Sequence, residues 1–338
     1  MSAPDIRPPV PRPLLVGGLA LLVAALFAGS LAAGRAPVAL FRTIGEVLSR
    51  EPSLFGIILT EIRLPRAILG LMIGATLGLA GAALQGLTRN PLAEPGLVGV
   101  SGSAALGAVV VFYFGLAGAF PPALPLGGMA GAAVGAVLVL ALAGRGAGPL
   151  GLVLAGVAVT SLAGALTSLA LNLAPSLYAA LEIVFWLLGS LADRSMSHVW
   201  LAAPFMVAGW LVLLALGRPL DALSLGEEAA ASLGFNVGRV GILLVLGTAL
   251  SVGAAVAVAG SIGFVGLVVP HLLRPFVGHR PSRLLLPSML GGAALLLAAD
   301  IVVRLVSASP ELQLGVVTAL VGAPFFLALV LGRKGGMA

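Results

Sequence analysis

The residues that could do chemistry are few in this chain, and the most regular group is a polar stretch, 218–239, between two long apolar runs. Ser224 and Glu227 have the S-x-x-E spacing of a capping box, which predicts that a helix begins at Ser224. Glu228 adds a second carboxylate where the helix dipole favours negative charge, and Gly234 is a natural stop. The pattern predicts a short, rigid, exposed helix on which another protein can push.

Signatures of catalysis and of metal binding are absent from the sequence. The three histidines are scattered without metal-ligand spacing, and there are no cysteines for thiolate sites or disulfides. A phosphate-binding loop needs a lysine followed by Ser or Thr, and the only lysine, Lys334, is followed by Gly335. We therefore expect no catalytic residue, no metal site and no ATP-binding loop, which disfavours a membrane-bound enzyme.

Charged residues within the apolar runs are also few. Asp300 and Arg304 lie four residues apart near the end of one run and share a helix face, so they form a local ion pair unless Arg304 points to the outer surface. Proton-coupled carriers usually show chains of Asp, Glu or His within their spans, and such chains are missing. A proton- or sodium-coupled secondary carrier is the weaker alternative, and a purely structural membrane subunit stays open.

Two polar segments flank the second apolar run. Before it, Arg63 and Arg66 lie three residues apart and form either ordinary membrane-surface anchors or a basic patch that pairs with acidic side chains. After it, the segment 88–96 holds two prolines and a glycine, which predict a compact turn. The turn is either a connector or, because it is short and stiff, a constriction at the inner end of a pathway.

Composition identifies the elements that must position these residues. Of the 338 residues, 60% are hydrophobic and 9% are charged, against about 25% charged in soluble domains. Only helices and closed barrels satisfy their backbone in lipid, and the apolar runs are too long and continuous for barrel strands. The fold class is therefore an all-α integral membrane protein, whose net charge of +6 reflects membrane orientation rather than nucleic-acid binding.

About ten apolar runs are long enough to be candidate spans, since a span needs about 20 residues. The shorter piece 178–191 predicts an interfacial or re-entrant helix, and the span that contains Pro270 is expected to bend. A single transmembrane domain, 14–331, then lies between an N-terminal segment, 1–13, and a tail, 332–338. The predicted spans are 14–33, 66–87, 96–116, 123–143, 150–172, 196–217, 240–259, 261–277, 285–306 and 313–331.

Lysine and arginine indicate the orientation of these spans. Eleven of the 18 basic residues fall on one side of the membrane under this assignment and seven on the other, so the side with eleven is assigned to the cytoplasm. Both termini and the polar stretch 218–239 are then cytoplasmic.

Glycine recurs at every fourth residue in two of the predicted spans. Such faces of small residues let helices approach closely, either within one subunit or along a pathway or subunit contact. The two series are Gly70, Gly74 and Gly78, and Gly127, Gly131 and Gly135.

Several segments resemble the FecCD-type, or type II, permeases of ABC importers, which carry iron chelates and cobalamin. The resemblance keeps the family's order and covers most of residues 61–331. Its motifs are Arg63-Leu-Pro-Arg66, Asn90-Pro-Leu-Ala-Glu-Pro-Gly96, Gly260-Ser-Ile-Gly-Phe-Val-Gly-Leu-Val-Val-Pro-His271, Ala299-Asp-Ile-Val-Val-Arg304 and Gly315-Val-Val-Thr-Ala-Leu-Val-Gly-Ala-Pro-Phe-Phe326.

The resemblance implies the architecture of a type II permease with ten helices, in the inner membrane of a bacterium. It implies a homodimer in lipid with the translocation path at the dimer interface. Two ATPase partner subunits are expected to bind ATP and Mg²⁺, and an outer binding protein to deliver the substrate. No cofactor is implied for this chain itself, and nucleic acid is not an expected partner.

The resemblance also assigns roles to single residues. Arg63, Arg66 and Arg304 match positions that receive acidic residues of the binding protein, and Asn90, Pro91 and Leu92 match the cytoplasmic gate. The segment 146–151 takes the place of a second gate segment, with Gly-Pro-Leu where the family has small hydroxyl residues. The residues that match the ATPase-coupling helix are Ser224, Gly226, Glu227, Glu228, Ala229, Ala230, Leu233 and Gly234.

The expected substrate is a bulky metal chelate. A wide, mostly apolar path with little fixed charge suits a metal that is already wrapped by its own ligand. A ferric siderophore or haem is favoured by its frequency in the family, and cobalamin is the alternative.

Overall fold

The structure is a computed structural model, which describes residues 11–34, 43, 45–47, 49, 53–120, 122–144, 148–306 and 311–334. All regular elements in these ranges are helices, which confirms the predicted all-α membrane class. Seven helical segments are long and apolar enough to cross a membrane, and they match seven of the predicted spans. They are α1 (Arg12–Ala32), α4 (Leu64–Thr88) with the turns before it, α7 (Ala123–Ala143), α8 (Pro149–Asn172), α10 (Met196–Ala215), α13 (Val237–Ala259) and α15 (Pro281–Val306).

The other three predicted spans are an interrupted helix, a short helix and a 21-residue helix with a proline inside it. The span predicted at 96–116 is a 3₁₀ turn, η2 (Pro95–Val98), followed by α5 (Val100–Tyr113), because Gly99 breaks the helix with φ of 80°. The span around Pro270 is α14 (Val265–Leu273), which passes into the 3₁₀ turn η3 (Arg274–Val277). The last is α16 (Leu314–Lys334).

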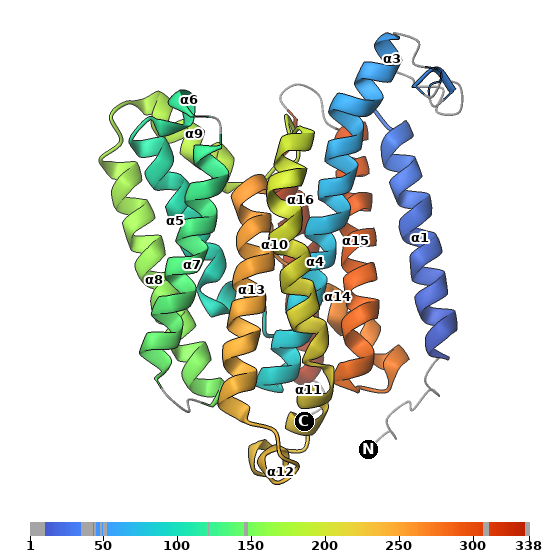
Figure 1. The fold of residues 1–338 in the computed structure, drawn as a ribbon, viewed down its shortest axis with the longest axis vertical. Coiled ribbons are helices and arrows are strands. Elements are labelled where there is room, and N and C mark those ends of the chain that lie inside the picture. The colour runs from blue at the N-terminus through green and yellow to red at the C-terminus, as the bar shows by residue number, and fades with distance from the viewer. Residues whose placement is uncertain are drawn as a thin grey trace.

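Short helices join the long ones. The apolar piece predicted at 178–191 is α9 (Leu177–Leu187), capped at its start by Ser176, whose side chain accepts from the Ala179 amide at 3.1 Å. The remaining short helices are α3 (Leu54–Ile57), the π-helical η1 (Ile58–Arg63), α6 (Leu116–Ala119), α11 (Gly217–Leu223) and α12 (Glu227–Ser232). Helix α12 lies at one end of the bundle and α3 at the other (Figure 1).

Glycine decides how closely the long helices pack. A Cβ on Gly74 of α4 would lie 2.3 Å from the carbonyl oxygen of Gly292 in α15, so the two backbones touch. A Cβ on Gly131 of α7 would lie 2.2 Å from the carbonyl oxygen of Ser103 in α5. Both glycine series therefore serve packing within the subunit, which confirms the first of the two interpretations.

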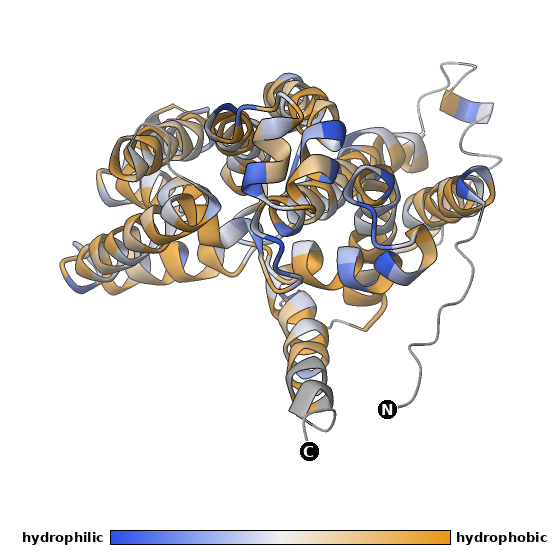
Figure 2. Ribbon diagram, turned by 90° about the horizontal axis from the view of Figure 1, so that it is seen from below, coloured by the Kyte–Doolittle hydropathy of each residue, from blue (hydrophilic) through white to orange (hydrophobic). Residues whose placement is uncertain are grey.

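Helix α4 is the centre of the bundle, and α16 is its least embedded part. Nearly every residue of α4 is buried, packed between α15, α14, α10 and α13. Helix α1 packs on α15 at one edge, with α5, α7 and α8 at the opposite edge (Figure 1). Seen from below, α16 projects away from the remaining helices, with hydrophobic residues along its length (Figure 2).

Candidate functional site

An arginine cluster occupies one end of the bundle, where the end of α1, the start of α4 and the end of α15 meet (Figure 1). The Arg66 guanidinium donates to Asp300 Oδ1 from Nε at 2.9 Å, and Asp300 is 1% exposed. Arg304 pairs with the other oxygen of Asp300 at 2.9 Å. The interpretation of Asp300 and Arg304 as a local ion pair is therefore confirmed. Arg66 also binds the more exposed carboxylate of Glu311.

The other contacts of this cluster are with the last carbonyls of α1. Arg63 Nη1 donates to the oxygens of Leu31 and Ala32 at 2.9 and 2.7 Å. Arg304 Nη1 donates to the oxygen of Ser30 at 2.9 Å. Helix C-terminal carbonyls have no partner within the helix and carry partial negative charge, so the arginines complete the end of α1.

The structure pairs Arg63 and Arg66 with groups of the same subunit. Arg63 and Arg66 are buried, and the side chain of Arg304 is 8% exposed. Their partners come from residues up to 274 positions away in the chain, which sequence spacing does not reveal. Of the two carboxylates that the described residues place on Arg66, Glu311 is the more accessible, with a side chain that is 31% exposed.

The turn after α4 lies at the opposite end of that helix. Helix α4 ends as Arg89 takes the left-handed conformation with φ of 51°. Asn90 Oδ1 then accepts from the amide of Leu92 at 3.0 Å, and the Asn90 carbonyl accepts from the amide of Ala93 at 3.2 Å. These bonds confirm the predicted compact turn. Pro91 and Leu92 are half-buried within it.

The polar stretch folds as two short helices, and its capping box is not formed. Ser224 ends α11 in a helical conformation and donates from Oγ to the Asp221 carbonyl at 2.6 Å. An N-cap residue needs an extended backbone, so α12 begins at Glu227 after Gly226, whose φ is 117°. The start predicted at Ser224 is therefore wrong, whereas Glu227 and Glu228 do lie in the first turn.

The predicted stop of α12 is confirmed. Gly234 has φ of 87°, its amide donates to Ala231 at 2.9 Å, and the amide of Phe235 donates to Ala230 at 3.0 Å. These two bonds form a Schellman motif, which satisfies the last carbonyls of the helix. Ala229 is half-buried and Ala230 is buried.

Helix α12 lies against Arg89, next to the segment predicted as a gate, and against Gly148 in the segment predicted as a second gate. Glu227 Oε1 lies 3.8 Å from Nη2 of Arg89, the residue just before Asn90. A Cβ on Gly148, at the start of α8, would lie 2.9 Å from the other Glu227 oxygen. The second gate segment was predicted at 146–151, and residues 146 and 147 lie outside the described ranges.

Asp221 links α11 to the start of α15. Its carboxylate accepts from Arg280 Nε at 2.8 Å, from the Ser282 amide at 2.8 Å and from the Ser282 hydroxyl at 2.7 Å. Burial by itself raises the pKa of Asp221, but the bonds from Ser282 and Arg280 outweigh it and hold the pKa below its usual value.

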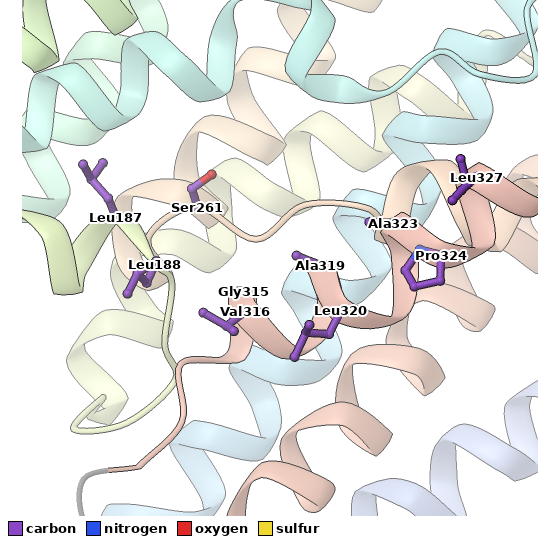
Figure 3. Close-up of a pocket in the computed structure, with 10 residues that line it drawn as sticks. All are labelled: Leu187, Leu188, Ser261, Gly315, Val316, Ala319, Leu320, Ala323, Pro324 and Leu327. Carbon is purple, nitrogen blue, oxygen red and sulfur yellow. The ribbon is translucent and has the colours of Figure 1, made fainter.

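An apolar hollow of about 720 Å³ lies beside α16 (Figure 3). Among the described residues that line it, Ser261 contributes the only hydroxyl. The start of α16 is held at its edge, because the Gly315 amide donates to the Gly189 carbonyl at 3.3 Å. The lining residues are Leu187, Leu188, Ser261, Gly315, Val316, Ala319, Leu320, Ala323, Pro324 and Leu327. The hollow has the size and apolar character of a small-molecule pocket.

The FecCD transport family matches residues 21–332 of the chain. The chain belongs to this family. Over 329 residues it is 38% identical to the hemin transport system permease protein HmuU of Yersinia pestis, covering 95% of this chain and 96% of that protein. It is 39% identical to the vitamin B12 import system permease protein BtuC of Klebsiella pneumoniae over 321 residues, covering 94% and 93%. This FecCD-family chain is therefore an ABC importer permease and a multi-pass membrane protein.

A solved structure supports the same assignment for the fold. It is described as an inward-facing conformation of a metal-chelate type ABC transporter, and its superposition on the FecCD-family chain has a TM-score of 0.83. The two chains are 32% identical, and the match covers 95% of this chain and 99% of the other. The predicted type II permease architecture is confirmed.

Sequence reasoning missed Gln85. This side chain is 2% exposed and joins several segments of the FecCD-family chain. Gln85 Nε2 donates to the carbonyls of Ala93 and Gly266 at 3.4 and 3.3 Å, and Gln85 Oε1 accepts from Arg274 at 2.5 Å. Gln85 thereby connects the turn that follows α4 to α14. An uncharged amide within an otherwise apolar run was the signal that could have identified it.

Glu94 also joins distant segments, although the sequence analysis assigned it no role beyond its place in a motif. Glu94 Oε1 accepts from the Phe264 amide at 2.6 Å, where Phe264 has φ of 66°. Gly266 approaches so closely that a Cβ on it would lie 2.7 Å from Pro95. The turn after α4, η2 and the start of α14 therefore pack together. The described ranges hold no cluster of three metal-ligating side chains.

Proposed function

We propose that this permease forms, as a homodimer, the path of an ATP-driven importer for a bulky metal chelate. The observation that carries the proposal is the apolar hollow beside α16 (Figure 3). Helix α16 projects from the bundle (Figure 2), and its Leu320, Val321 and Leu327 are exposed. A second copy placed against this surface encloses a path with apolar walls. The described residues that line the hollow carry no charge, which suits a chelate whose charge is masked by its own ligand.

A ferric siderophore or haem is the substrate that we propose first. The hemin permease of Yersinia pestis is 38% identical over nearly the whole chain, which supports this choice. Cobalamin is the second candidate, because relatives named as vitamin B12 or cobalamin permeases are 39–43% identical. We expect selectivity to lie largely in the binding protein, which must recognise each chelate as a whole.

ATP hydrolysis is assigned to two partner subunits that hold ATP and Mg²⁺. Helix α12 is the proposed coupling helix, because it is short, capped at both ends by glycine and joined to the gate turn through Glu227 and Arg89. A push on α12 would reach Asn90–Leu92 through this pair and through the contact at Gly148. We propose that this end and both termini face the cytoplasm of a bacterium, in its inner membrane.

Binding-protein docking is proposed at Arg63, Arg66 and Arg304, at the opposite end of the bundle. Glu311 is more exposed than Asp300, the other carboxylate described on Arg66, and can give up its place to a carboxylate of the binding protein. Asp300 stays buried beneath and keeps Arg66 and Arg304 in position. Docking thus replaces the Glu311 carboxylate with a carboxylate of the binding protein, on arginines that are already held in place.

The deciding experiment measures the ATPase activity of the partner subunit when it is copurified with this chain in lipid. Candidate binding proteins are added either empty or loaded with haem, a ferric siderophore or cobalamin. Stimulation by one loaded binding protein supports the proposal and identifies the substrate. If no ATPase copurifies and no binding protein has an effect, the proposal fails, and uptake driven by a proton or sodium gradient is the alternative to measure.

A further inference from the structure

Helix α16 rests on the short non-helical segment 261–264, which leads into α14. A Cβ on Gly315 would lie 2.8 Å from the carbonyl oxygen of Ser261, and a Cβ on Gly322 would lie 2.3 Å from the Cβ of Phe264. Gly315 and Gly322 are seven residues apart, which is about two helical turns, so they share one face of α16. Ser261 and Gly315 also line the hollow beside α16 (Figure 3). The segment 261–264 therefore sets the position of the helix that borders the hollow.

Phe264 has a backbone conformation that its own side chain does not favour. Its φ of 66° and ψ of −24° lie in the left-handed region, which a bulky residue keeps only when its surroundings impose it. The imposing group is Glu94, whose Oε1 accepts from the Phe264 amide at 2.6 Å. A Cβ on Gly263 would lie 3.6 Å from the same oxygen. Glu94 thus holds the segment on which α16 rests.

Glu94 is 170 residues earlier in the chain than Phe264 and belongs to the turn after α4. Within the described ranges, no other side chain of this turn forms a hydrogen bond with the segment 261–264. The bond from Gln85 joins the same turn to Gly266, inside α14, and does not reach that segment. Glu94 is therefore the polar link between the turn and the support of α16.

The Phe264 side chain completes the link on the side of α16. It lies between α14 and α16, where it lines a small apolar gap together with Thr318, Val321 and Gly322 of α16. Gly322 has no side chain, so Phe264 packs directly on the backbone of α16. Close-packed contacts of this kind transmit displacement, because little empty space is left to absorb it.

We infer that Glu94 is a positioning residue of the transport path, which acts through Phe264 so that the turn after α4 and α16 move together. The inference rests on the proposed function, because that function makes the hollow part of the path, places the inner gate in the turn and supplies the ATPase as the motor. Without the bond, the Phe264 amide loses its acceptor and the residue can leave the left-handed region. The turn then moves without α16.

The test follows the hollow with a single thiol. The chain has no cysteine, and Leu320 lines the hollow and is 69% exposed, so Leu320→Cys gives one thiol per copy on α16. The protein is copurified with its ATPase subunit in lipid, and the rate of reaction with a water-soluble maleimide is measured without nucleotide and with ATP, Mg²⁺ and vanadate. We expect these two rates to differ by about threefold or more.

Three further substitutions, each combined with Leu320→Cys, test the link. Glu94→Met removes the acceptor at similar size, and we expect the difference between the two rates to fall below about 1.5-fold. Phe264→Ala keeps the amide but removes the ring that packs on Gly322, and it should cause the same loss. Glu94→Gln keeps an oxygen acceptor in place and should preserve the difference.

The ratio of the two rates distinguishes positioning from a general loss of structure. A less stable complex loses ATPase activity and changes both rates together, whereas a broken link lowers the ratio while the ATPase activity is retained. If Glu94→Met does not fold, Phe264→Ala and Glu94→Gln still decide the question.

The outcomes separate the inference from the function on which it rests. Loss of the ratio in Glu94→Met and Phe264→Ala, with retention in Glu94→Gln, supports the inference. A ratio of wild-type size in Glu94→Met or Phe264→Ala overturns it and leaves the proposed function intact, as does an ATPase-active parent whose thiol reacts equally in both states. A parent that retains no ATPase under any condition overturns both.

Discussion

Arg66 and Asp300 form a buried ion pair between α4 and α15, with Nη2 and Oδ1 2.8 Å apart. Asp300 also pairs with Arg304, so one carboxylate balances two guanidinium groups at the end of the bundle. Charge buried in this way is costly when a partner is removed, because the remaining ions have lost their solvent. The pair therefore organises the surface that we propose for docking.

Removal of Asp300 tests this role. We expect Asp300→Ala to lower the free energy of unfolding by about 3–5 kcal/mol, because Arg66 and Arg304 are left partly unpaired. Denaturant unfolding of the purified protein measures the change. Glu182→Ala removes an exposed carboxylate from α9 and should shift stability by less than about 0.5 kcal/mol. Equal stability of the two variants would contradict the role.

Gly74 tests the contact of α4 with α15. Gly74→Ala places a methyl group against the Gly292 carbonyl, and we expect it to destabilise the protein by about 1–3 kcal/mol. Gly17→Ala is the matched control, because no atom lies within 4 Å of the added methyl group on α1. Thermal unfolding in one detergent compares the two. A loss of similar size in both variants would place the effect outside this contact.

Helix α12 is tested by reversing its two carboxylates. The double variant Glu227→Arg with Glu228→Arg removes the acidic start of the helix and its pair with Arg89, so we expect loss of ATPase retention. Unfolding temperature should stay within a few degrees of wild type, because both side chains are exposed.

The control for α12 is Glu61→Arg, an exposed carboxylate near the arginine cluster at the other end. It reverses one carboxylate where the double variant reverses two, and it should retain the ATPase. Transport by the double variant at the wild-type rate would remove α12 from the coupling path.

Glu311 tests carboxylate exchange at the docking end. Glu311→Gln frees one face of Arg66, so we expect the binding protein to bind about three- to tenfold more tightly at low salt. Biolayer interferometry on the permease in nanodiscs measures this affinity. Glu61→Gln should leave it unchanged. Docking that is unaltered or weakened by Glu311→Gln would show that Glu311 does not compete for the arginine.

Asp221 predicts a pH dependence of stability. Its folded pKa lies below the unfolded value, so its contribution is complete above about pH 4 and declines as pH falls through the folded pKa. Because the side chain is partly exposed and screened, we expect about 0.5–1 kcal/mol between wild type and Asp221→Asn at pH 7. Unfolding at pH 3–7 should show this difference shrinking at the acid end. A difference that grows towards low pH would contradict the assignment.

Much of the fold could be predicted because its signals are local. Seven spans follow from apolar length, and the glycine faces follow from a four-residue period on α4 and α7. The stop of α12 at Gly234 follows from the ease with which glycine adopts positive φ. Each of these properties is set by residues within one or two helical turns.

The start of α12 shows where local signals fail. Ser224 and Glu227 satisfy the capping pattern, but Asp221 is bound by Arg280 and Ser282, some 60 residues later in the chain. These bonds hold α11 helical up to Ser224 and leave no extended backbone for an N-cap there. A tertiary contact thus overrides the propensity of the sequence.

The sequence by itself determined the membrane class, the helical architecture, the lack of a nucleotide-binding loop and the residues on which the candidate sites depend. Only the tertiary structure decided what those residues touch. Arg66 meets Asp300, Gln85 meets Gly266 and Glu94 meets Phe264 across more than 150 residues of chain. Buried polar groups must find partners, and the packing of α4 against α14 and α15 decides which partners are within reach.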